Sequence, residues 1–149
     1  MTTVYLVRHG EAEGNSLRYF QGHTDGAITE KGKQQLACLK QRFSSIPLDV
    51  IYSSDLQRAY DTAKAMQGER DIPLYTTQQL REINGGDWEG KKWTQLVEEY
   101  GETSYYTWEH DPEHHQMPGG ESMAQAQQRM KQEMTRIMAE NPGKIIGVA

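Results

Sequence analysis

An arginine, a histidine and a glycine stand together at positions 8 to 10, directly after a short apolar run at residues 4–7. That run is rich in β-branched and aromatic residues, so it predicts a buried strand. Ligands bind at the carboxyl ends of strands in an open α/β sheet, which places Arg8 and His9 at the mouth of a site. Arginine offers a planar fork of donors suited to phosphate or carboxylate, and a neutral imidazole offers a nucleophilic nitrogen near neutral pH. Because Gly10 lets the backbone turn sharply, the triplet predicts an anion held beside a nucleophile, with a solvated strand end as the alternative.

Two further donors could reach the same anion. Asn15 lies in the loop that follows the triplet, and its amide can donate a hydrogen bond. Arg58 lies in the first turn of a predicted helix, where the helix dipole favours negative charge. An anion bound between Arg58 and the helix N-terminus would remove this conflict. The alternative is that Arg58 pairs with Asp55 or Asp61.

Glu82 is the candidate proton donor. It comes shortly after the strand predicted at residues 73–77, where its carboxyl could approach a bound phosphate. A like charge nearby raises the pKa of a carboxyl, and a carboxyl tuned in this way can protonate a leaving group. An ordinary surface glutamate is the alternative.

The segment at residues 11–28 is polar and rich in glycine, which predicts a loop at the border of the site. Gln21, Gly22 and His23 form a possible substrate loop within it. A lone loop histidine is more often solvated, and this remains the alternative for His23.

The segment at residues 101–120 is polar and dotted with aromatic residues, and it is also predicted to be a loop. Together with the first loop it should determine substrate specificity. Tyr105, Tyr106 and Trp108 could line an apolar rim there, and simple packing is an equal alternative.

Two histidines of this second segment, His110 and His114, have the spacing of a metal-binding pair on a helix. Pro112 lies between them, and no other helix signal surrounds them. We therefore expect a solvated loop or a pocket rim here, and no metal.

The composition limits the possible functions. The 149 residues predict a single domain with a real core, although the apolar share of 36% is low. The net charge of -5 and the lack of a basic block argue against nucleic acid as a partner. Cys38 is the only cysteine and is expected to be a small core residue on a helix. No signal peptide or membrane-spanning run is visible, so the cytoplasm is the expected location and a membrane is not an expected partner.

The hydrophobic periodicity predicts alternating strands and helices. Thr29 should cap the first long helix, and either Ser53 or Ser54 should cap the second. This order indicates a doubly wound α/β sheet. The strands are expected at 4–7, 49–53, 73–77 and 144–149, and the helices from about 30 to 43, from after Asp55 to about 67, over 93–100 and over 123–138.

Several segments resemble the histidine phosphatase superfamily, in its phosphoglycerate mutase-like branch. The resemblance covers the whole chain in order and implies a single domain over residues 1–149. It also implies a three-layer α/β/α sandwich with a mostly parallel central sheet, and a phosphohistidine intermediate. The motifs are Val-Arg-His-Gly-Glu at 7–11, Gly-His-Thr-Asp-Gly-Ala-Ile-Thr-Glu-Lys-Gly at 22–32, Tyr-Ser-Ser-Asp-Leu-Gln-Arg-Ala-Tyr-Asp-Thr-Ala at 52–63, Leu-Arg-Glu-Ile at 80–83, Gly-Asp-Trp-Glu-Gly at 86–90 and Gly-Gly-Glu-Ser at 119–122.

The resemblance assigns roles to the candidate residues. It implies that His9 takes the phosphoryl group, that Arg8 and Arg58 clamp the phosphate oxygens with help from Asn15, and that Glu82 protonates the leaving oxygen. Phosphoryl transfer depends mainly on positioning and charge stabilisation, so these groups supply much of what it needs. The resemblance implies no metal and no organic cofactor.

One departure from the family concerns a second catalytic histidine, which the family carries directly after the strand matching residues 144–148. This sequence stops at Ala149, and His110, His114 and His115 lie too early in the chain to match it. The family also continues with at least one more helix, and the low apolar share fits a lost C-terminal core segment. Loss of one preorganised donor typically costs about a hundredfold or more in rate. We therefore expect the 149-residue form to be weakly active or inactive.

Three functions remain open at this point. The first is hydrolysis of small phosphomonoesters, so the expected partner is a small phosphorylated metabolite, with the oligomeric state undetermined. The second is a cofactor-dependent phosphoglycerate mutase, which in the family has a much longer insert after the acid than the 36 residues between Glu82 and Gly119. The third is a phosphate-binding protein without catalysis.

Overall fold

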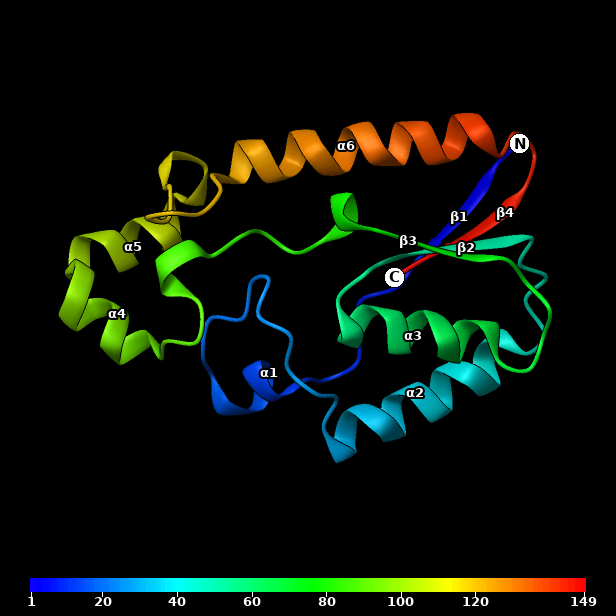
Figure 1. The fold of residues 1–149 in the computed structure, drawn as a ribbon, viewed down its shortest axis with the longest axis horizontal. Helices are drawn as coiled ribbons and strands as arrows, with labels where there is room; N and C mark the ends of the chain where they lie inside the picture. The colour runs from blue at the N-terminus through cyan, green and yellow to red at the C-terminus, as the bar shows by residue number, and fades with distance from the viewer.

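A four-stranded parallel sheet forms the centre of the computed structural model, which describes residues 1–149. Its strands are β1 (Thr3–Leu6), β2 (Val50–Ser54), β3 (Leu74–Thr77) and β4 (Ile145–Val148). They lie in the order β1-β4-β2-β3, so the last strand of the chain separates the first two (Figure 1). All four strands stand where the sequence predicts them.

Helices cover both faces of this sheet (Figure 1). α2 (Glu30–Phe43) and α3 (Gln57–Gln67) lie on one face, and α6 (Met123–Glu140) lies on the other. Alternate residues of β2 reach opposite layers, since Ile51 packs in the cluster of α2 and α3 while Val50 packs in the cluster of α6. The predicted three-layer arrangement is therefore confirmed.

The helix ends show how local sequence fixes these elements. The Thr29 hydroxyl accepts a hydrogen bond from the Gly32 amide at 3.1 Å, which confirms its predicted capping role at α2. At α6, Ser122 and Gln125 cap each other reciprocally.

The predicted cap of α3 is wrong. Its N-cap is Leu56, which has no capping side chain, and the Asp25 carboxylate accepts from the Gln57 amide at 2.9 Å and 3.0 Å instead. Ser54 only accepts from the Leu56 amide, and Ser53 donates to the carbonyl of Ser54. A residue from the segment before α2 therefore caps α3, which sequence position alone does not reveal.

Two expectations of burial are also wrong. β1 was predicted to be buried, but it is an edge strand paired only with β4, and Leu6 is 77% exposed. Leu6 lies in an open apolar groove of about 730 Å³ together with Met130 and Met134 of α6. Cys38, predicted to be a core residue, is exposed on α2 because the inward face of that helix is formed by other residues, Phe43 among them.

The two predicted loops contain more structure than expected. α1 (Glu13–Leu17) interrupts the first, and the second contains α5 (Glu102–His110) and a 3₁₀ turn at Pro112–His114. α5 follows α4 (Trp93–Tyr100), the helix that the sequence predicts at this position. α5 has no strongly apolar stripe, and its packing against α4 supplies stability that local propensity does not.

An aromatic cluster holds this distal part together, at the end of the molecule where α4 and α5 lie (Figure 1). The Trp88 side chain is fully buried at its centre, in a 3₁₀ turn over Gly86–Trp88. Phe20 meets Trp88 edge to face at a centroid distance of 6.0 Å. Phe20 thereby anchors the segment before α2 to the aromatic cluster.

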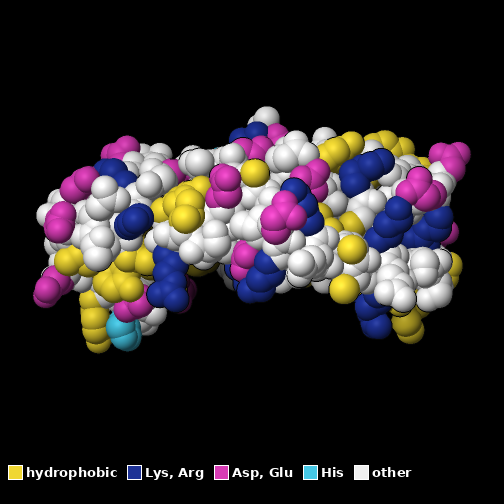
Figure 2. Space-filling view, turned by 90° about the horizontal axis from the view of Figure 1, so that it is seen from below, with side chains coloured by type: hydrophobic (Ala, Val, Ile, Leu, Met, Phe, Trp, Pro, Cys, Tyr) yellow, Lys and Arg dark blue, Asp and Glu magenta, His cyan; other side chains and the backbone are white.

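The surface mixes charges of both signs. Figure 2 shows Lys and Arg side chains interspersed with Asp and Glu over the face that carries α1 and α2 in Figure 1. No helix of the chain combines the length and the apolar character that crossing a membrane would need.

Candidate active site

The site lies where the carboxyl ends of β1 and β2 face the aromatic cluster. A pocket of about 380 Å³ opens there, and it brings together all five residues to which the sequence assigns roles. Gln21 and Gly22 of the predicted substrate loop also line it, whereas His23 does not. The full lining consists of Arg8, His9, Asn15, Tyr19, Phe20, Gln21, Gly22, Arg58, Glu82, Ile83, Trp93, Trp108 and Met123.

The His9 ring is half-buried and held in one orientation. Its Nδ1 lies 2.7 Å from the carbonyl oxygen of Gly10, and because a carbonyl can only accept, Nδ1 is the nitrogen that carries the proton. Nε2 then keeps its lone pair. Burial lowers the pKa of His9 below its usual 6.5, the Gly10 carbonyl opposes this, and Arg58 and Arg8 lower the pKa further. The ring is therefore neutral near pH 7, with a nucleophilic nitrogen available.

A hydrogen-bonded chain ties the loop of His9 to α3. The Gly10 amide donates to the Thr62 hydroxyl at 3.1 Å, and that hydroxyl donates to the Arg58 carbonyl at 2.8 Å. Thr62 is fully buried and was not among the predicted site residues. Its spacing of one helical turn from Arg58 is the signal that could have identified it.

Arg58 is buried, with only 2% of the residue exposed, yet no carboxylate binds its guanidinium. It donates to the carbonyl oxygens of Thr24 at 2.9 Å and Gly22 at 2.6 Å. The alternative that Arg58 pairs with Asp55 or Asp61 is wrong, because both carboxylates bind other side chains. Burial lowers the pKa of Arg58, but an arginine stays charged near neutral pH, so its positive charge remains available to an anion.

The two aspartates near Arg58 have partners of their own. Asp55 forms a two-pronged ion pair with Arg81 at 2.6 Å and 2.5 Å. Asp61 accepts a hydrogen bond from the Gln57 side-chain amide at 2.6 Å. Neither carboxylate therefore pairs with the guanidinium of Arg58.

Asn15 reaches the pocket from α1. Its side-chain oxygen accepts from the Ala12 amide at 3.0 Å, which leaves the amide nitrogen as the group that can donate to a ligand. This is the arrangement that the predicted assisting role requires.

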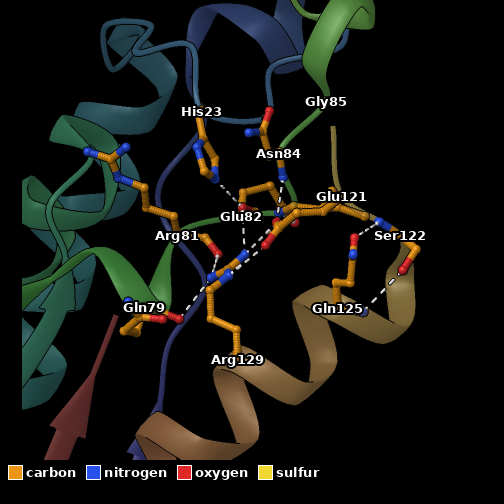
Figure 3. Close-up of polar contacts among 12 residues, drawn as sticks. His23, Gln79, Arg81, Glu82, Asn84, Gly85, Glu121, Ser122, Gln125 and Arg129 are labelled. Carbon is orange, nitrogen blue, oxygen red and sulfur yellow. Dashed lines mark hydrogen bonds and ion pairs between the residues drawn. The ribbon is translucent and has the colours of Figure 1, made fainter. Parts of the chain in front are cut away.

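Glu82 lies at the pocket mouth, in the segment that leads from the sheet to the aromatic cluster. One of its carboxylate oxygens accepts from the Ile83 amide at 2.9 Å. The His23 ring donates through Nε2 to the Glu82 carbonyl at 2.9 Å (Figure 3). His23 is therefore bonded beside the candidate acid, and its alternative as a simply solvated residue is wrong.

Arg129 of α6 holds the same segment from the other side, and the sequence did not single it out. It forms a two-pronged pair with Glu121 at 2.9 Å and 2.8 Å, and this interaction lowers the pKa of the Glu121 carboxyl. Figure 3 shows its remaining donors directed at the backbone around Glu82. The accepting carbonyls belong to Gln79, Arg81 and Glu82, at 2.8, 2.9 and 3.3 Å.

Glu121 completes this clamp. Its carboxylate accepts from the Asn84 amide at 2.9 Å, and its own amide donates to the Asn84 carbonyl at 2.9 Å (Figure 3). The Gly-Gly-Glu-Ser motif thus fixes the chain directly after Glu82.

The remaining histidines lie away from the pocket. His110 stacks on Tyr106 with ring centroids 4.0 Å apart, and His114 pairs with Asp111 at 2.8 Å. His115 is buried against Trp88. Tyr106 is 61% exposed and outside the pocket, so of the three predicted rim residues only Trp108 lines it, while Tyr105 packs on Trp93.

The sequence pattern of the histidine phosphatase superfamily (branch 1) matches residues 4–149. The chain belongs to this superfamily. Phosphoserine phosphatase 1 of Hydrogenobacter thermophilus is 36% identical over 131 residues, which are 88% of this chain and 62% of that protein. The probable phosphoglycerate mutase GpmB of Erwinia tasmaniensis is 38% identical over 140 residues, 93% of this chain and 64% of that protein.

Solved structures of other proteins share the fold. Bacillus stearothermophilus YhfR superposes with a TM-score of 0.95 at 34% identity, over 99% of this chain and 73% of that one. A putative alpha-ribazole-5'-P phosphatase of Escherichia coli superposes with a TM-score of 0.88 at 28% identity, over 98% of this chain and 72% of that one. The chain therefore spans about two thirds to three quarters of the length of these relatives.

The geometry predicts that two histidines titrate on opposite sides of pH 6.5. Burial lowers the pKa of His9, whereas the hydrogen bond that the His114 ring donates to the Asp111 carboxylate raises the pKa of His114. An NMR titration of the ring protons should therefore show His9 losing its proton at lower pH than His114. The neutral form of His9 then persists into mildly acidic solution. The reverse order of midpoints would contradict the burial and orientation described for His9.

Removal of the Arg129 clamp should loosen the segment around Glu82. In Arg129→Ala, hydrogen exchange at the Asn84 amide should accelerate by about tenfold or more, because charge-assisted hydrogen bonds contribute about 1.5–3 kcal/mol. Arg136→Ala is the matched control, since Arg136 lies on the same helix and pairs only with Glu133 and Glu140. Equal exchange in both variants would show that Arg129 does not hold this segment.

Proposed function

We propose that this protein is a phosphatase of small phosphomonoesters that works through phosphorylation of His9. The observation that carries the proposal is the convergence of His9 with two arginines on one pocket. Membership of the superfamily supports it, as do the relatives named as phosphatases. This chain covers only part of the length of those relatives, so their named substrates are candidates for this protein and nothing more.

The first chemical step transfers the phosphoryl group to the protein. The lone pair of His9 Nε2 attacks phosphorus and forms the N–P bond while the bond from phosphorus to the leaving oxygen breaks. Glu82, in its protonated form, gives its proton to that oxygen, so the leaving group departs as a neutral alcohol. Arg8, Arg58 and the Asn15 amide stabilise the three remaining phosphate oxygens, where charge spreads in the transition state.

The second step releases phosphate. Glu82, now a carboxylate, takes a proton from water, and the resulting hydroxide attacks phosphorus as the N–P bond breaks. The electron pair of that bond returns to His9 Nε2, which regenerates the starting ring. None of these steps requires a group beyond the described side chains and water.

A phosphoglycerate mutase is the second candidate, because GpmB relatives carry that name with the qualifier "probable". The short stretch of 36 residues between Glu82 and Gly119 favours the phosphatase. The products distinguish the two: a mutase converts 3-phosphoglycerate into 2-phosphoglycerate, whereas a phosphatase releases inorganic phosphate. We expect inorganic phosphate, in an assay that follows both products from one reaction.

A phosphate-binding protein without catalysis remains the third possibility. It would bind phosphate in the same pocket but never carry it covalently on His9. The cytoplasm stays the predicted location. A single-turnover labelling experiment tests the first step without depending on repeated turnover.

Labelling should require His9 in particular. With a radiolabelled phosphomonoester, the unaltered chain should retain acid-labile label, and His9→Asn should retain at least a hundredfold less, because the reacting nitrogen is gone. Asparagine can still donate to the Gly10 carbonyl, so the loop should keep its fold. His114→Asn is the control and should label normally. Undiminished label in His9→Asn would reject the proposed role, and phosphate binding without any label would favour the phosphate-binding protein.

A further inference from the structure

The pocket is lined by apolar side chains as well as by charged and polar ones. Besides the proposed phosphate-binding groups, five large apolar or aromatic side chains line it. The side chains concerned are Phe20, Ile83, Trp93, Trp108 and Met123. These surround the space that the remainder of a phosphomonoester would occupy once its phosphate lies against His9.

This aromatic wall is rigidly built. Phe20 packs edge to face against Trp93 at 5.8 Å and against Trp108 at 5.6 Å between ring centroids. Trp93 is backed further by Tyr105 at 5.5 Å. Both tryptophans are only partly buried, so they keep exposed surface that a ligand can cover. A preorganised apolar surface of this kind binds without first having to order itself.

The lining contains no third cation that could bind a second acidic group. Arg8 and Arg58 lie at the phosphate end, and the other ionisable side chains of the lining are His9, Tyr19 and the acidic Glu82. A carboxylate on the leaving group would therefore meet Glu82 and apolar rings. Three cations of neighbouring segments are already paired: Arg81 with Asp55, Arg129 with Glu121 and Lys91 with Glu99.

We propose that the preferred substrates are phosphomonoesters whose leaving group is uncharged and aromatic, lying against Trp93 and Trp108. This inference rests on the proposed function, because it assumes that the phosphate group occupies the pocket end at His9. It disfavours small acidic leaving groups, such as the amino acid part of phosphoserine or the glycerate part of phosphoglycerate. Trp93 and Trp108 then act as specificity-determining residues, contributed by α4 and α5.

The test compares four phosphate-like ligands on the unaltered chain by calorimetry. These are inorganic phosphate, methylphosphonate, phenylphosphonate and phosphonoacetate. Phenylphosphonate should bind about tenfold or more tightly than methylphosphonate, as expected for an aromatic contact and its buried area. Phosphonoacetate should bind no better than methylphosphonate, because its carboxylate finds no cation.

Variants then locate the effect. Trp108→Leu should remove most of the preference for phenylphosphonate, measured as the ratio of its affinity to that of methylphosphonate in the same variant. Tyr106→Leu is the matched control, since Tyr106 lies on the same helix but is exposed and outside the pocket. Trp93→Leu provides a second test from a different helix, and thermal unfolding of each variant checks that it is folded.

The outcomes separate this inference from the function on which it rests. Equal binding of phenylphosphonate and methylphosphonate, with inorganic phosphate still bound, would overturn the aromatic preference alone. Tighter binding of phosphonoacetate than of phenylphosphonate would overturn it as well. Absence of binding by all four ligands would remove the proposed phosphate site itself, and the aromatic preference with it.

Discussion

The site depends on one feature of the sheet, which is the position of β4 between β1 and β2. β1 touches the rest of the sheet only through β4, with Val4 opposite Ile146 and Leu6 opposite Val148. β4 pairs in turn with β2, which leads into the helix of Arg58. The two halves of the phosphate pocket are thus aligned by a strand that contributes no residue to it. Because parallel pairing fixes the register, the carboxyl ends of β1 and β2 must open on the same side.

The aromatic cluster around Trp88 forms the side of the pocket opposite the sheet. The segment after β3 leaves the sheet, carries Glu82 past the phosphate end and enters the aromatic cluster at Trp88. Without support, this extended segment would be mobile. The Glu82 carboxyl would then vary in position by more than the hydrogen-bond distance that proton transfer requires. Arg129 and Glu121 supply that support through backbone contacts on both sides of Glu82. Glu82, the proposed acid, is therefore positioned by Glu121 and by Arg129 of α6, and the proposed specificity surface comes from α4 and α5.

The sequence predicted the strands and most helices because their apolar periods are strong and local. It also predicted five residues of the pocket, since Arg8 and His9 follow β1 and Arg58 lies in the first turn of the helix after β2. The errors concern features set by distant parts of the chain. The exposure of β1 follows from strand order, the cap of α3 comes from Asp25, and α5 is held by aromatic contacts of Trp108 with Phe20. Arg129 escaped notice because its partners are mainly backbone carbonyls, which carry no sequence signal.

The hydrogen-bond partners of the buried Arg58 guanidinium explain how a chain of net charge -5 can bind an anion. A carboxylate partner would have satisfied this buried guanidinium, but it would also have cancelled the charge that a phosphate needs. Carbonyls of Gly22 and Thr24 satisfy its hydrogen bonds and leave that charge in place. The same hydrogen bonds fix the position of the loop around Gly22, which lines the pocket. The nearby Asp55 pairs with Arg81 instead of Arg58. Fold and electrostatics therefore depend on the same few contacts, because the interactions that shape the loop also keep the site positive.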